Sequence, residues 1–206
     1  VSDSQCREGV GVWPWARTIH ARLVEQLEDL GARQIAFDID FSARSNPASD
    51  KTFAKAIGAA EVPVFLAAFR QNKAADDAGV VLHRPIDLLA AEGWPALVNV
   101  PLDDDGRVRR FPARMTIGGE RLDALPALIA AAPEGTGTIA IDYSIDLRAL
   151  PHVSASDVLY GRVKPGLLAG KTALVGARAL ELHDFLLVPR WGVVAGADVV
   201  AMASET

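Results

Sequence analysis

Three aspartates are the residues of this 206-residue chain whose type and spacing could carry chemistry. Asp38 and Asp40 alternate with apolar residues in an expected strand, so they share one of its faces. Asp184 follows a later expected strand, and open α/β sheets bind ligands at the carboxyl ends of their parallel strands. Because carboxylates are costly to bury without partners, a cluster of the three needs cations or hydrogen-bond donors beside it.

The partner of this carboxylate cluster is left open by the sequence. Arg109, Arg178 or Lys171 could neutralise it and make it a structural ion-pair network; otherwise a bound amine or a metal ion would occupy it. The spacing matches no known ion-binding loop, so we predict neither a metal site nor a cofactor. Asn99, near the end of another expected strand, is a minor candidate. The predicted ligand-binding residues are Asp38, Asp40, Asn99, Arg109, Arg178 and Asp184.

The usual catalytic signatures are missing from the sequence. It contains no Gly-x-Ser-x-Gly turn, no Gly-x-x-x-x-Gly-Lys-Ser/Thr phosphate loop and no His-Glu-x-x-His motif. The single cysteine, Cys6, has no histidine near it in sequence and cannot form an internal disulfide. We therefore assign no catalytic residue and do not expect an enzyme.

The elements that must position the aspartates alternate between helix and strand. Apolar residues at helical spacing predict a helix over 15–30, which Gly31 ends and in which His20 is expected to be a hydrogen-bonded packing residue. Ser49 or Asp50 is expected to cap a helix that runs to residue 59. Further helices are expected over 86–91, over 122–132 and from 197 onward; strands over 34–41, 62–69, 96–100, 107–117, 139–143 and 172–175; a loop over 71–79; and a tight turn at 118–119. This alternation predicts an α/β fold, a single domain with a mostly parallel central sheet flanked by helices.

Charge and hydropathy narrow the class of protein. The net charge of −5 argues against a nucleic-acid partner, which would require a basic face. No run of about 18 apolar residues occurs, so no membrane-spanning segment is expected within the sequence. The chain begins with Val1, and we interpret it as a piece of a longer protein.

Five short segments form an ordered set that spans nearly the whole chain. In this order they resemble the CHASE family of extracellular sensory domains, specifically its type-two class. The chain departs from that pattern at Arg178, where the family tends to carry a small hydroxylated residue, and at His183. The segments are Trp13-Pro14-Trp15 with Arg17 and His20-Ala21; 36–42 followed by Asp50 and Phe53; 103–110; 170–177; and Asp184 with Pro189 and 195–201.

The resemblance implies the input domain of a bacterial transmembrane receptor, spanning residues 1–206 and lying outside the cytoplasm, in the periplasm. Similar proteins carry cyclase, diguanylate cyclase or kinase outputs. An unknown small molecule would be the ligand, flanking helices outside these residues would attach the protein to the membrane, both chain ends would lie on one side, and a homodimer is one arrangement. Two alternatives stay open: a dimerisation module without a ligand, and a periplasmic hydrolase that uses Asp38 and Asp184 as an acid/base pair.

Overall fold

The computed structural model describes residues 13–72, 79–176 and 184–206, and a five-stranded sheet lies at its centre. Within this sheet β1 lies between β2 and β9, and β4 pairs with the other side of β2. The parallel strands are β1 (Gln34–Asp38), β2 (Val64–Asn72), β4 (Trp94–Leu97) and β9 (Thr172–Gly176); β3 (Val80–His83) is antiparallel to the far half of β2. The mostly parallel sheet of a single α/β domain confirms the predicted fold class.

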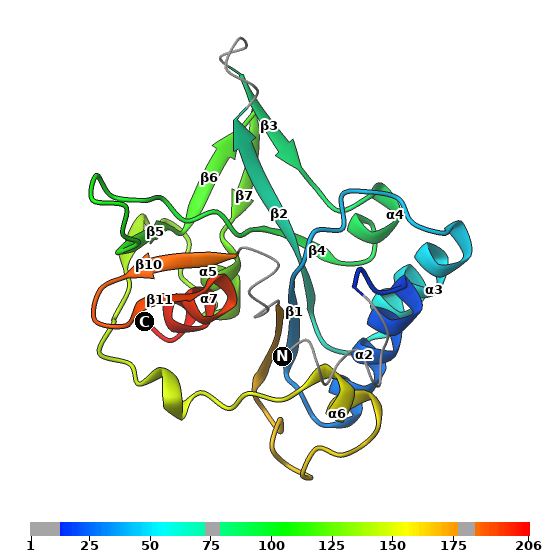
Figure 1. Cartoon of the computed structure of the whole chain (residues 1–206). Helices are drawn as coiled ribbons and strands as arrows, with labels where there is room; N and C mark the ends of the chain where they lie inside the picture. The colour runs from blue at the N-terminus through cyan, green and yellow to red at the C-terminus, as the bar shows by residue number, and fades with distance from the viewer. Residues whose placement is uncertain (1–12, 73–78, 177–183) are drawn as a thin grey trace.

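Helices cover both faces of this sheet (Figure 1). On one side lie α2 (Arg17–Asp29) and α3 (Pro47–Ala59), and on the other lie α5 (Leu125–Ile129) and α7 (Gly196–Ser204). The residues of β1 show why both faces need a cover. Ile35 and Phe37 pack with α2 and α3, whereas Ala36 packs with α5 and α7, and all three are fully buried. The described residues also form the short helices α4 (Asp87–Ala90) and α6 (Ala155–Leu159).

Outside the central sheet, the described part of the chain forms three two-stranded antiparallel sheets. The turn between β6 and β7 is Gly118-Gly119, as expected, and both glycines have a positive φ, of 60° and 86°. The three sheets are formed by β5 (Arg110–Pro112) with β8 (Thr138–Ala140), β6 (Arg114–Ile117) with β7 (Glu120–Asp123), and β10 (Phe185–Val188) with β11 (Gly192–Ala195).

Several predicted elements were wrong in extent. The strand expected over 107–117 is divided into β5 and β6 at Ala113, where the chain leaves β8 for β7: its N–H donates to Gly137 and its carbonyl accepts from Ala124. The helix expected over 122–132 begins only at Leu125, because Leu122 belongs to β7. The loop expected from residue 71 starts later, because β2 continues to Asn72.

The cap of α3 is also not the one expected. Ser49 and Asp50 lie inside the helix, and Asn46 is the cap: its Oδ1 accepts hydrogen bonds from the N–H groups of Ala48 (2.9 Å) and Ser49 (3.3 Å). Pro47 occupies the first helical position, where its missing N–H costs nothing. Asp50 instead lies 3.5 Å from the Nε of Arg17 on α2 and links the two helices.

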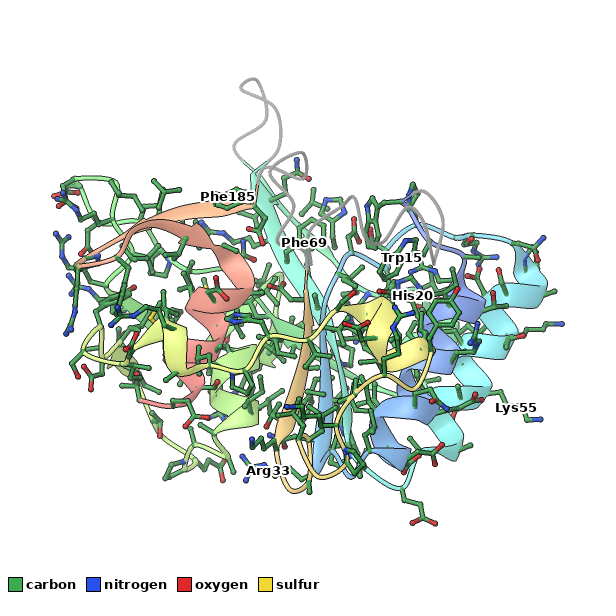
Figure 2. The ribbon with its side chains drawn as sticks, turned by 60° about the horizontal axis from the view of Figure 1, so that its bottom comes forward. Trp15, His20, Arg33, Lys55, Phe69 and Phe185 are labelled. Carbon is green, nitrogen blue, oxygen red and sulfur yellow. The ribbon has the colours of Figure 1, made fainter. Side chains whose placement is uncertain are left out.

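His20 lies at the centre of an aromatic cluster between α2, α3 and β1. Its ring centroid is 5.1–6.1 Å from those of Phe37, Phe41 and Phe53, and Figure 2 shows Trp15 beside it. The side chain is 2 % exposed, and neither ring nitrogen has a hydrogen-bond partner within the described ranges, so the packing role is confirmed without the expected hydrogen bond. Burial and the charge of Arg17 lower the pKa of His20 to about 4, against a small opposite effect of the Ala16 carbonyl.

No helix in the described part of the chain is long and apolar enough to cross a membrane. The expectation that both chain ends lie on one side concerns residues 1–12, which are outside the described residues.

Candidate functional site

Asp38 is the last residue of β1 and lies opposite Gly176, the last residue of β9. The glycine is required by close packing. A Cβ at position 176 would lie 2.7 Å from the Cβ of Ala197 and 3.5 Å from that of Asp38. The start of α7 therefore lies directly against the carboxyl ends of β1 and β9, on the side of the sheet to which Asp38 points.

Asp184 lies at the same helix terminus. Its carbonyl accepts a hydrogen bond of 3.0 Å from the N–H of Gly196, the first residue of α7. Its carboxylate occupies the space that a Cβ of Gly196 would need. A carboxylate in this place is favoured because the amino terminus of a helix carries partial positive charge. Because Gly176 and Gly196 carry no side chain, the end of the sheet, the start of α7 and both aspartates can lie together.

The two carboxyl groups influence each other. Burial among protein atoms raises the pKa of Asp38 to about 7, and the negative charge of Asp184 adds to this shift. Burial also raises the pKa of Asp184, although part of its side chain is in contact with water. Neither side chain forms an ion pair or a hydrogen bond with another described residue. The pair therefore holds a proton close to neutral pH or attracts a positively charged group.

The other predicted site residues are engaged elsewhere. Asp40 is exposed, accepts a hydrogen bond of 2.7 Å from the N–H of Ser42, and its charge acts on Arg17. Asn99 pairs through its side-chain amide with the backbone N–H and carbonyl of Arg70, continuing the edge of β2.

Arg109 is held by carboxylates close to it in sequence. Its guanidinium nitrogens lie 2.8 Å from the Oδ2 of Asp103 and 2.6 Å from the Oδ2 of Asp105. Arg178 lies outside the described residues. The structure thus brings Asp38 and Asp184 together, keeps Asp40, Asn99 and Arg109 in other networks, and provides no arginine for the pair within the ranges that it describes.

A groove of about 470 Å³ runs along β9, the edge strand of the central sheet. Its floor is formed by residues 171–176, one wall by α2 and α6, and the other by α5 and α7. The segment Leu150–Val153 crosses it, as the yellow chain in front of β9 shows in Figure 2. At the carboxyl end of β9 the groove reaches Gly176 and Ala197, beside Asp38 and Asp184.

His152 and Asp198 are polar residues of this groove that the sequence did not single out as site candidates. The Nε2 of His152 lies 3.2 Å from the Oδ1 of Asp198, which is in the first turn of α7. The two residues are 46 positions apart, and no spacing pattern connects them. Only the position of Asp198 as the third residue of an apolar helix could have signalled that it faces the sheet.

Comparisons with known proteins agree with this fold. A family model, the CHASE2 domain, matches residues 2–206, which is essentially the whole chain. No curated protein and no solved structure gave a match. Within the described residues, no group of three or more metal-binding side chains occurs. On the strength of the match over its whole length, the chain belongs to the CHASE2 family of extracellular sensory domains.

Proposed function

We propose that this CHASE2 domain is the ligand-sensing input of a bacterial transmembrane receptor, located on the periplasmic side of the inner membrane. The family match over residues 2–206 is the observation that carries this proposal. The output would be a cyclase, a diguanylate cyclase or a kinase, joined to this domain through membrane helices that are not among these residues. The domain itself would bind its ligand without turnover.

Asp38 and Asp184 are the residues that we propose to contact the ligand. A bound cation would relieve the repulsion between the two carboxyl groups and lower the pKa of Asp38. Two carboxylates are too few for Ca²⁺, which takes six to eight oxygen ligands, so an organic ammonium group suits the pair better.

The conformational response would begin at α7. The first residues of α7 contact Gly176 and Asp184. A ligand that draws the two carboxylates together would therefore shift the position of α7 against the sheet. A ligand can shift the balance between two receptor states only by its difference in affinity for them. The carboxylate of Asp184 lies against Gly196 at the start of α7, and its charge acts on Asp38 at the end of β1, so Asp184 is suited to respond to such a ligand.

Thermal-shift and calorimetric titrations test this site. Ethanolamine, putrescine, Mg²⁺ and Ca²⁺ would be added to the purified domain at pH 7.5. We expect an amine to stabilise the wild type, by about 2.7 kcal/mol at a hundredfold excess over its Kd. Asp38→Asn and Asp184→Asn should lose this effect, while Asp104→Asn, which alters an exposed aspartate in a distant turn, should retain it. Equal stabilisation of all four proteins would disprove the site.

A periplasmic hydrolase is the second candidate, because adjacent carboxyl groups with a raised pKa also serve as acid/base pairs. The same variants distinguish the two functions. Steady turnover of generic ester, phosphoester or glycoside substrates by the wild type, lost in Asp38→Asn, would replace the sensor with an enzyme.

A further inference from the structure

The outer edge of β9 carries no paired strand among the described residues, although the segment Leu150–Val153 crosses in front of it. β9 pairs only with β1 among the described strands, and the backbone groups on its other side have no described partner. Its sequence, Thr172-Ala173-Leu174-Val175-Gly176, contains neither a charge nor a proline. Natural proteins cover or charge such edges, since unpaired N–H and C=O groups readily pair with another chain.

The groove along the outer edge of β9 can hold a peptide in an extended conformation. Helices on both faces of the sheet project beyond β9, so an added strand would place alternate side chains against α2 and α6 on one side and α5 and α7 on the other. Five residues of β9 span about 16 Å at the usual rise of a strand. The cavity volume of about 470 Å³ lies within the range of small-ligand sites.

Charges of opposite sign lie at the two ends of the groove. Arg33 and Lys171 lie where β9 begins, and neither side chain pairs with an acidic group in the described ranges (Figure 2 labels Arg33). Glu205, after the end of α7, is the acidic lining residue at that end. At the other end Asp198 and His152 lie beside the carboxyl end of β9. A ligand with a carboxylate at one end and an ammonium group at the other matches this order.

We infer that this groove binds a short peptide with free termini, which adds to β9 as an antiparallel strand. Its carboxyl terminus lies at Arg33 and Lys171, and its amino terminus lies at Asp198. Backbone hydrogen bonds to β9 supply affinity, and the apolar walls select small aliphatic side chains. The inference goes beyond the proposed function, because binding at β9 requires neither Asp38 nor Asp184.

Titration of the ¹⁵N-labelled domain with the tetrapeptide Ala-Val-Ala-Val tests the inference. We expect the amide signals of residues 172–176 to shift and to become protected from exchange. The same peptide with methylated backbone nitrogens cannot donate these hydrogen bonds and should bind at least about 10-fold more weakly. Equal binding of the two peptides, or shifts confined to another face, would overturn the inference.

Two pairs of variants locate the ends of the peptide. Lys171→Ala should weaken binding about 5-fold or more, whereas Lys164→Ala, an exposed lysine outside the groove, should leave it unchanged. Asp198→Asn should weaken binding of the free peptide but not of its N-acetylated form. If neither Lys171→Ala nor Asp198→Asn weakens binding, the assigned orientation of the peptide is wrong. A dimer whose β9 amides are already protected would show that a second copy of the chain occupies the edge.

The outcome is separable from the amine site. Neither Asp38 nor Asp184 lines the groove, and a simple amine has no backbone groups that could pair with β9, so the comparison of the free and N-methylated peptides tests the groove alone. Failure of peptide binding would therefore leave the carboxylate pair untouched, and failure of amine binding would leave the groove untouched.

Discussion

Burial acts on two single side chains of this domain in opposite directions. Burial raises the pKa of Asp38 to about 7 and lowers the pKa of His20 to about 4. Both groups therefore favour the neutral form in the folded protein, because little water reaches them to stabilise a charge. Their effects on stability run in opposite senses as the pH changes.

For Asp38 the folded-state pKa is higher than the value of 3.8 expected for the unfolded chain. The unfolded state therefore binds fewer protons between about pH 4 and 7, and stability falls as the pH rises through this range. Asp38→Asn carries no such charge, so we expect it to be more stable than the wild type at pH 8 by on the order of 4 kcal/mol. Urea unfolding at pH 5 and pH 8 checks this; a variant that is less stable at both values would show that the carboxylate has a cationic partner.

For His20 the folded-state pKa is lower than the unfolded value of 6.5. Its contribution is present above about pH 6.5 and is lost as the pH falls towards 4, by on the order of 3 kcal/mol. His20→Leu should abolish this loss, whereas His152→Gln, which alters a partly exposed histidine, should not. Measuring both in an Asp38→Asn background removes the overlapping titration of Asp38. An unchanged acid slope in His20→Leu would contradict the prediction.

Glycines set how closely α7 approaches the central sheet. Gly176 ends β9 and Gly196 begins α7, and a side chain at either position would meet Ala197 or Asp184. The same contact that holds the helix against the sheet also places the carboxylate of Asp184. The packing of α7 against the sheet and the position of the Asp184 carboxylate therefore depend on the same glycines.

Gly196→Ala is expected to destabilise the domain by about 1–3 kcal/mol, because the new methyl group overlaps the carboxylate of Asp184. Gly137→Ala is the matched control, since a Cβ at that position meets open space. In an Asp184→Ala background the cost of Gly196→Ala should fall by more than half. Chemical denaturation of the wild type, Gly196→Ala, Asp184→Ala and the double variant measures this coupling. Additive effects would mean that the side chain of Asp184 does not lie over α7.

The hydrophobic clusters of the described residues are joined through the central sheet and through α5 and α7. The first cluster joins α2, α3 and β1 and includes Trp15; another joins β10, β11 and α7 and includes Trp191. β1 contributes Ile35 and Phe37 to the first cluster and Ala36 to a third that contacts α5 and α7. In α7, Val199 and Met202 belong to the cluster of Trp191 and Val200 belongs to the third, so loss of packing in one cluster exposes an element that another cluster also buries.

The domain should consequently unfold in one cooperative step. Variants that retain only Trp15 or only Trp191, with the other tryptophans replaced by phenylalanine, report on the two clusters separately. Within each variant the fluorescence midpoint in urea should coincide with that of far-UV circular dichroism. Midpoints that differ between probes would reveal two independently stable halves.

The spacing of apolar residues predicts those elements whose buried face is evident from their own sequence. The helix of α2 and strands β1, β2 and β9 follow from their apolar patterns, and the meeting of Asp38 with Asp184 follows from the parallel direction of β1 and β9. Tertiary pairing decides the rest. Ala113 is a strand break only because its two backbone groups have different partners, and β10 and β11 escaped prediction because Leu187 and Val193 pair on an exposed face. Arg109 was assigned to a distant site although Asp103 and Asp105 lie within six residues of it.

The pairing of β1 with β9 has a consequence for the order in which the chain acquires its structure. The side chain of Gln34 donates a 2.7 Å hydrogen bond to Thr172, 138 residues further along. During synthesis from the amino terminus, β1 can pair with β2 early but lacks its second neighbour until β9 has been made. Contacts of such long range are slow to form, and an unpaired central strand is a template for self-association. We therefore expect self-association to be most pronounced in nascent chains that stop short of residue 172.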